Sequence, residues 1–170
     1  WIRVGILTLF ALLLGFAIYQ TVLNGRPNVL QEGDKAPNFA LQTLEGEEIE
    51  LLDYRGQGVL INFWASWCEP CKAEMPAIER RYQTHQDNGL VVLAVNVGEP
   101  EVSARGFAHS HQLTFPILLD PDKEVTKLYN VGQLPHSVFI NPDGSVGNIV
   151  IGEMNDTIIE EQVLKILPHK

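Results

Sequence analysis

The chain has 170 residues, the length of one domain with a short addition rather than of two full domains. Hydrophobic residues make up 45% of it and charged residues 19%, which allows a core and excludes a disordered protein. With 12 Lys and Arg against 21 Asp and Glu, the formal net charge is −9, and we expect no nucleic-acid partner because phosphate attracts basic surfaces.

The first segment of the chain is predicted to be a membrane anchor. Residues 4–23 contain no charged side chain, and a helix needs about 20 apolar residues to cross the hydrocarbon core. A cleaved signal peptide is the alternative, but its apolar region is usually only about 7–15 residues long. We therefore expect an anchor over residues 1–25, a polar linker over 26–34 and a folded domain over 35–170, exported behind the anchor.

The first half of this domain reads as a β-hairpin followed by a βαβ unit. Short alternating runs on either side of Glu45-Gly46-Glu47 predict the hairpin. Nearly unbroken apolar runs at 59–64 and 90–97 predict two strands that are buried on both faces. A helix from about Pro70 to Asn88-Gly89 is predicted between them, so the two strands should be parallel.

The second half is predicted to contain an inserted αβα segment, a second hairpin and a last helix. Asn141-Pro142-Asp143-Gly144 is a strong turn signal for the hairpin, and Asn155 can cap the last helix. The fold class is α/β, with a mixed central sheet and helices on both of its faces. The predicted elements are helices over 101–111 and 123–129 around a strand over 115–119, strands over 137–140 and 146–151, and a helix over 155–167.

The chain contains only two cysteines, Cys68 and Cys71, and their spacing predicts redox chemistry. A disulfide-stapled domain would show several widely spaced pairs. A structural zinc site needs four ligands, and no second pair of Cys or His stands at a matching spacing, so no metal is expected. The only expected redox group is the disulfide between Cys68 and Cys71, without a bound cofactor.

The two cysteines lie where a buried strand meets a helix. Cys68 falls just before the first helical turn, where free backbone N–H groups and the helix dipole stabilise the thiolate that attacks disulfides. Cys71 follows one turn later and can close a disulfide with Cys68. Pro70 should fix the turn between them, while Trp64 and Trp67 shield the pair and leave Cys68 reachable.

The segment from Phe63 to Pro76, Phe-Trp-Ala-Ser-Trp-Cys-Glu-Pro-Cys-Lys-Ala-Glu-Met-Pro, resembles the active-site segment of thioredoxin-like proteins. Its Cys-Glu-Pro-Cys form, with Glu74 three residues on, is similar to the ResA/TlpA branch of extracytoplasmic reductases, and to ResA-type proteins in particular. Further similar segments lie at 94–99, 115–120 and 134–144. The resemblance runs from about Gly33 to Pro168 and implies a thioredoxin fold.

The resemblance also implies an activity and partners. ResA-type proteins are anchored in the cell membrane by one span and act outside the cytoplasm in cytochrome c maturation. They reduce the cysteine pair of the haem-attachment motif in an apocytochrome c, and a membrane protein that passes electrons across the bilayer re-reduces them. The acidic side chains Glu69 and Glu74 near the thiols disfavour a thiolate and so favour a reductant.

Three alternatives stay open at this point. A dithiol oxidant, or a reductase of other proteins, would share the cysteine pair, although oxidants usually carry a larger helical insert. In a peroxidase of the peroxiredoxin type, the reactive cysteine ends a Pro-x-x-x-Thr-x-x-Cys motif. The residues before Cys68 do not match that motif. A copper chaperone on this scaffold is expected to have a C-x-x-x-C motif and a distant histidine ligand. The spacing here is C-x-x-C, and His136 is the only histidine that we can place near the pair.

Three positions are compared with the family one at a time, and the last of them departs from the family's pattern. Pro135 matches the cis-proline that faces the cysteines, which lets the backbone of Leu134 pair with an incoming peptide. Asn62 stands where thioredoxin has a buried aspartate, so proton handling is expected from Glu74, unless that residue is a solvated helix carboxylate. His136 stands where the family usually has threonine. Its imidazole could stabilise a thiolate when charged, or it could point to solvent, which we expect.

Together these positions define the predicted site. The predicted catalytic residues are Cys68, Cys71 and Glu74, and the predicted substrate-binding residues are Trp67, Glu69, Pro70, Leu134, Pro135 and His136.

Overall fold

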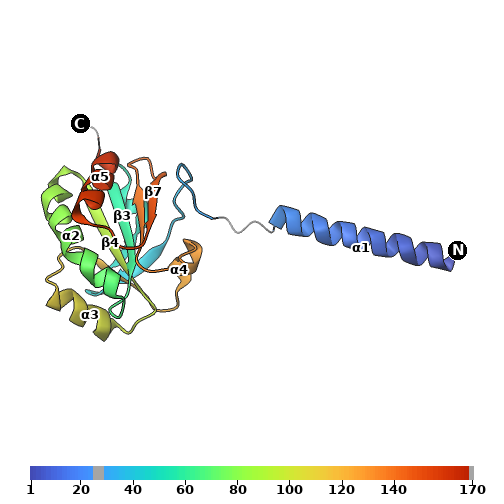
Figure 1. The fold of residues 1–170 in the computed structure, drawn as a ribbon, viewed down its shortest axis with the longest axis horizontal. Helices are drawn as coiled ribbons and strands as arrows, with labels where there is room; N and C mark the ends of the chain where they lie inside the picture. Colours follow the sequence, from blue (N-terminus) through green and yellow to red (C-terminus); the bar gives the residue numbers. More distant parts are fainter. Residues whose placement is uncertain (25–28, 169–170) are drawn as a thin grey trace.

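The computed structural model describes residues 1–24 and 29–168 of the chain (Figure 1). Its helices and strands follow the predicted order, with two short 3-10 turns in addition. They are α1 (Ile2–Asn24), β1 (Ala40–Thr43), β2 (Glu48–Glu50), η1 (Leu51–Tyr54), β3 (Gly58–Trp64), α2 (Glu69–His85), η2 (Gln86–Asn88), β4 (Leu90–Val97), α3 (Glu101–Ser110), β5 (Ile117–Asp120), α4 (Glu124–Leu128), β6 (His136–Ile140), β7 (Val146–Ile151) and α5 (Asp156–Ile166).

The uncharged N-terminal segment forms the helix α1. Over the residues that the structure describes, no helix combines the length and the apolar character that crossing a membrane requires. The structure therefore does not confirm the predicted anchor. The linker predicted over 26–34 begins outside the described residues, because 25–28 are not among them.

Seven strands form one mixed sheet in the order β2-β1-β5-β4-β3-β6-β7. The central strands β3, β4 and β5 are parallel, as a βαβ unit requires, whereas β6, β7 and the β1–β2 hairpin add antiparallel neighbours. Every residue of β3 is buried, which agrees with the prediction from its unbroken apolar run. The predicted thioredoxin-like α/β architecture is confirmed.

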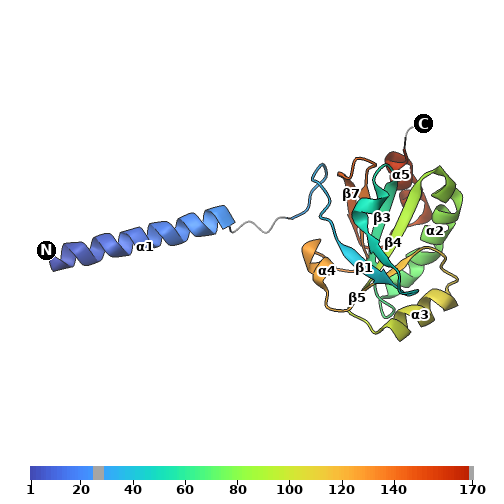
Figure 2. The ribbon, with the colours of Figure 1, turned by 180° about the vertical axis from the view of Figure 1, so that it is seen from behind.

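Helices cover both faces of this sheet (Figures 1 and 2). Apolar residues of α2, α3 and α5, such as Met75, Phe107 and Val163, form one core cluster with residues on one face of β3. On the other face, Val125 and Tyr129 at α4 pack with residues of the segment that precedes β1. The site described below lies where β3 leads into α2, and both cysteines belong to the first of these clusters.

Ionic contacts join the C-terminal half of α2 to α5. Arg80 and Arg81 both pair with Asp156, and Arg81 also contacts Glu160 at 3.1 Å. The Nε2 atom of the buried His85 lies 3.0 Å from the same Glu160 carboxylate. The helix that carries the cysteines is therefore held at the end away from them.

The two edges of the sheet differ in how they are covered. β2 forms one edge and presents Glu48 and Glu50 there. β7 forms the other edge, and its first residue, Val146, exchanges two backbone hydrogen bonds of 2.8 Å with Gly33 and Asp34. The chain just before the sheet thus covers the start of β7.

Candidate active site

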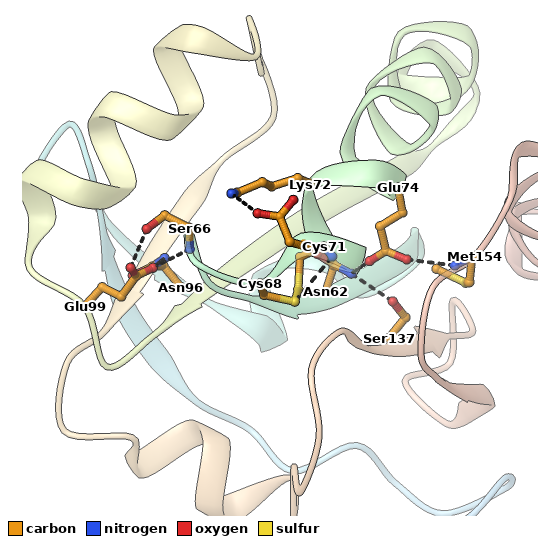
Figure 3. The surroundings of a disulfide bond; sticks show 11 residues. Asn62, Ser66, Cys68, Cys71, Lys72, Glu74, Asn96, Glu99, Ser137 and Met154 are labelled. Carbon is orange, nitrogen blue, oxygen red and sulfur yellow. Dashed lines mark hydrogen bonds and ion pairs between the residues drawn. A yellow bond between two sulfur atoms is a disulfide. The ribbon is translucent and has the colours of Figure 1, made fainter.

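Cys68 and Cys71 form a disulfide at the N-terminus of α2, with an S–S distance of 2.01 Å (Figure 3). Cys68 is the N-cap of the helix, and its sulfur accepts a hydrogen bond of 3.3 Å from the backbone N–H of Cys71. Cys71 is fully buried, whereas Cys68 keeps 5% of its surface exposed. The predicted placement is therefore correct, and Cys68 is the sulfur closer to solvent.

One ion pair lies next to the cysteine pair, between residues of the first turns of α2. Lys72, the only basic residue adjacent in sequence, places its ammonium group 2.6 Å from the carboxylate of Glu69. Because this ion pair is internal to the first turns of α2, the charge of Lys72 is largely matched by Glu69 rather than offered to the sulfurs. The positive influence on Cys68 comes mainly from the helix end itself.

The loop that leads into Cys68 is fixed by Glu99. The Glu99 carboxylate accepts hydrogen bonds from the backbone N–H of Ser66 at 2.7 Å and from the Ser66 hydroxyl at 2.5 Å. It also accepts one from the amide of Asn96 at 2.7 Å, so that the end of β4 is tied to the end of β3 (Figure 3). The sequence reasoning missed this group. The carboxylate that directly follows β4 was the available signal.

Glu74 lies on α2 one turn beyond Cys71, with only 1% of its surface exposed. Its two carboxylate oxygens accept hydrogen bonds from the Asn62 amide at 2.8 Å and from the backbone N–H of Met154 at 3.0 Å. Burial raises the pKa of Glu74 from its ordinary 4.5 to about 7, although these two hydrogen bonds oppose the change and Glu153 adds to it. The alternative of a solvated helix carboxylate is wrong.

The Asn62 amide connects Glu74 to a further polar residue. It donates a second hydrogen bond, of 2.9 Å, to the hydroxyl of Ser137 on β6. Dashed lines in Figure 3 join Ser137 to Asn62, Asn62 to Glu74 and Glu74 to the backbone of Met154, beside the disulfide. The buried polar group that stands in place of thioredoxin's aspartate is thus part of a chain of hydrogen bonds.

The peptide bond between Leu134 and Pro135 is cis, as the resemblance implied. His136 follows as the first residue of β6 and is only 5% exposed, so the expectation that it points to solvent is wrong. Its ring meets Phe63 edge-on at 6.1 Å, and in the described part of the chain neither ring nitrogen has a hydrogen-bond partner. Burial lowers the pKa of His136, which favours the neutral imidazole.

The two tryptophans differ in position. Trp64 is buried against Phe107, with the ring centres 4.6 Å apart, and belongs to the core cluster that contains both cysteines. Trp67 is 67% exposed, so most of its surface faces solvent rather than the core. Its place directly before Cys68 suits a contact with a substrate, and this role stays a prediction, as do those of Glu69, Pro70, Leu134, Pro135 and His136.

Metal binding has no support from the geometry. Across residues 1–24 and 29–168, no three His, Cys, Asp or Glu side chains form a group that could hold a metal ion.

Comparison with known proteins identifies the family. Residues 32–149 match the AhpC/TSA family. The thiol-disulfide oxidoreductase ResA of Bacillus subtilis (strain 168) is 40% identical over 168 residues, which cover 99% of this chain and 93% of the relative. This chain belongs to the AhpC/TSA family. Its similarity to ResA-type thiol-disulfide oxidoreductases, proposed from the segment 63–76, is thereby confirmed.

Other relatives of this AhpC/TSA-family protein agree. ResA of Geobacillus thermodenitrificans (strain NG80-2) is 42% identical over 166 residues, or 98% of this chain and 95% of the relative. The crystal structure of StoA from Bacillus subtilis superimposes with a TM-score of 0.66 at 32% identity, covering 76% of this chain and 98% of that one. This chain is a thiol-disulfide oxidoreductase that carries out dithiol–disulfide exchange. Cys68 and Cys71 form its disulfide, and their catalytic roles stay a prediction.

Proposed function

We propose that this oxidoreductase is a reductase of cytochrome c maturation. Its substrate is the disulfide formed by the two haem-attachment cysteines of an apocytochrome c, outside the cytoplasm. The observation that carries the proposal is the combination of a helix-capping Cys68, a buried Cys71 and, one turn later, a buried carboxyl group whose pKa is about 7. The resemblance to ResA-type proteins supports the choice of substrate.

The reaction begins at Cys68. Its thiolate attacks one sulfur of the substrate disulfide, which forms a mixed disulfide and releases the other substrate sulfur as a thiolate. The N–H of Cys71, 3.3 Å from the Cys68 sulfur, and the positive end of α2 stabilise the attacking thiolate.

Cys71 completes the reaction. Its thiol gives up a proton, and the resulting thiolate attacks the Cys68 sulfur, which breaks the mixed disulfide and releases the second substrate sulfur as a thiolate. Two electrons pass to the substrate and the Cys68–Cys71 disulfide is formed. Glu74 takes the proton in this proposal, because a carboxyl group with a pKa of about 7 can both accept and release a proton near neutral pH.

The direction of electron flow follows from the charges around the thiols. Strong oxidants of this kind owe their potential to a stabilised thiolate. Here Glu69 pairs with Lys72, and burial lowers the pKa of His136 and so favours the neutral imidazole. Neither residue therefore adds a positive charge beside Cys68. A weakly stabilised thiolate favours the disulfide and makes the dithiol a good electron donor.

The proposal includes a membrane tether and a donor. Residues 1–25 are the proposed tether, supported by the absence of charge over 4–23. A membrane protein that carries electrons across the bilayer would then reduce the disulfide again. The full chain should remain with the membranes after alkaline extraction, whereas a chain without residues 1–25 should not. Recovery of the full chain in the soluble fraction would refute the tether.

Trapping tests the substrate and the roles of the cysteines. Cys71→Ser should accumulate mixed disulfides through Cys68, and the matched Cys68→Ser variant should not. An apocytochrome c is expected among the trapped proteins. In vitro, the reduced enzyme should reduce an oxidised Cys-x-x-Cys-His peptide faster than an oxidised Cys-x-x-Cys peptide without the histidine. Equal trapping by both variants would overturn the cysteine roles, and equal rates would overturn the substrate.

A further inference from the structure

Asn62 holds an unusual set of hydrogen bonds for a fully buried amide. Its Nδ2 group donates to Oε1 of Glu74 at 2.8 Å and to the Ser137 hydroxyl at 2.9 Å, so both of its N–H bonds are used. Its Oδ1 atom is buried, and over the described residues it accepts no hydrogen bond. An unpaired buried acceptor costs on the order of 1–3 kcal/mol, which calls for an explanation.

The surroundings of Glu74 are suited to only one of its two protonation states. One carboxylate oxygen faces the Asn62 amide N–H and the other faces the backbone N–H of Met154. Two donors stabilise the ionised form, but a protonated carboxyl group also needs an acceptor for its own O–H. The backbone N–H cannot be exchanged for a carbonyl, whereas a side-chain amide becomes an acceptor when it turns by half a rotation.

We propose that Asn62 is a positioning residue whose amide reverses each time Glu74 takes up or releases a proton. After reversal, the O–H of Glu74 donates to Oδ1 of Asn62, and the hydroxyl of Ser137 turns to donate to the same oxygen. Each state therefore has two hydrogen bonds at the amide: Nδ2 donates both beside the ionised carboxylate, and Oδ1 accepts both beside the protonated one. The amide atom that is not used takes the unpaired position in each state. The inference rests on the proposed role of Glu74 as proton acceptor.

The proton balance of this step is simple. The proton leaves the Cys71 thiol as its sulfur attacks the mixed disulfide, and it binds to Glu74. No other covalent bond changes, because the amide and the hydroxyl only rotate. An aspartate in place of Asn62 could only accept, and it would put a second negative charge beside the ionised Glu74.

Among the described residues, the titratable groups near the Asn62 amide come from α2 and from the loop before α5. On α2 these are Cys71, Cys68 and Glu74 itself, and the loop before α5 contributes Glu153, whose charge raises the pKa of Glu74. His136 precedes Ser137 on β6, so its side chain projects from the opposite face of the strand and packs with Phe63. In the disulfide form neither cysteine titrates, and Glu74 is then the group that drives the reversal.

The amide reversal can be observed directly by NMR of the full-length oxidised chain. Between pH 5 and pH 9 the side-chain amide signals of Asn62 should change with a midpoint near pH 7, together with the carboxyl carbon of Glu74. The contact between the Asn62 amide protons and the β protons of Ser137 should be strong at pH 9 and lost at pH 5. In Glu74→Gln the Asn62 signals should not depend on pH.

The same spectrum contains a matched control. Asn141 donates from Nδ2 to the Ser145 hydroxyl at 3.0 Å and makes no hydrogen bond to Glu74, so its amide–serine contact should persist over the whole range. If Glu74 titrates near pH 7 while the Asn62 contact to Ser137 stays constant, the reversal is refuted and the proton role of Glu74 stands. If Glu74 does not titrate between pH 5 and pH 9, that role and the reversal both fail.

Kinetics of a variant provide an independent readout. Asn62→Leu removes both the donor to the ionised carboxylate and the acceptor for the protonated one. The bond to the ionised group is the stronger of the two, so the pH midpoint of disulfide exchange should rise, by up to about one pH unit. A purely structural role would lower the rate equally at every pH and leave the midpoint in place, which would count against the proposal. The NMR measurement uses the unchanged protein and does not depend on how well this variant folds.

Discussion

Replacing Glu74 by glutamine is expected to stabilise the protein at pH 8 and to leave its stability nearly unchanged at pH 4. Glu74 has a pKa of about 7 in the folded protein and an ordinary value of 4.5 in the unfolded chain. Between these two pH values the folded state binds more protons than the unfolded chain does. The contribution of Glu74 to the free energy of unfolding is therefore fully present below pH 4.5 and is lost as the pH rises to about 7. The difference corresponds to roughly 3 kcal/mol, at about 1.4 kcal/mol per pKa unit.

Solvent screening should reduce this difference in the free energy of unfolding only slightly, because Glu74 is 1% exposed. The glutamine cannot accept from both Asn62 and Met154 as a carboxylate does, so we expect a net gain of about 2 kcal/mol at pH 8. Urea unfolding of the wild type and Glu74→Gln at pH 4 and pH 8 measures it. Glu161→Gln, a change at an exposed carboxylate of α5, is the control and should have no effect at either pH. An equal difference between wild type and Glu74→Gln at both pH values would refute the reasoning.

Further predictions concern the redox properties and the domain. The reduction potential should lie near thioredoxin's, around −270 mV, when the protein is equilibrated with glutathione and dithiothreitol; a value above about −180 mV would favour the oxidant alternative. His136→Thr should leave this potential unchanged, since the buried imidazole is neutral; a more negative potential in the variant would mean that the imidazole is charged beside Cys68. Glu74→Gln should also slow disulfide exchange, and unchanged rates from pH 6 to 9 would exclude a proton role. Removing residues 1–25 should leave a folded, redox-active domain, and precipitation of the shortened chain would place this segment within the fold.

Local patterns were sufficient to predict most of the architecture. The unbroken apolar runs at 59–64 and 90–97 correspond to β3 and β4, and their parallel pairing follows from the single helix between them. Phe115-Pro116 is different: it was expected to open β5, which begins at Ile117. The Pro116 carbonyl still accepts from the N–H of Ala94, but proline has no N–H to donate to a ladder.

The site was predictable where one element determines it and not where several elements meet. Cys68, Cys71 and Glu74 lie at the start of one helix at intervals of three residues. Their spacing in the sequence was therefore sufficient to predict that they lie one turn apart on the same side of the helix. The hydrogen bonds of Glu99 to Ser66 and Asn96 depend on the register of β3 beside β4, in which Trp64 pairs with Asn96. The burial of His136 was missed for a related reason, since a single polar residue at the start of a strand carries no signal of the layer that covers it.

The covering of the two sheet edges affects how copies of the protein meet one another. An uncovered edge strand is a template on which a second molecule can add its own strand, and this is a common start of aggregation. At β2, pairing with the same strand of a second copy would bring Glu48 and Glu50 of the two copies close together, and like charges repel. At β7 the backbone groups of Val146 are already bonded to Gly33 and Asp34. The charges at β2 and the covered start of β7 therefore both hinder the addition of a strand from a second copy.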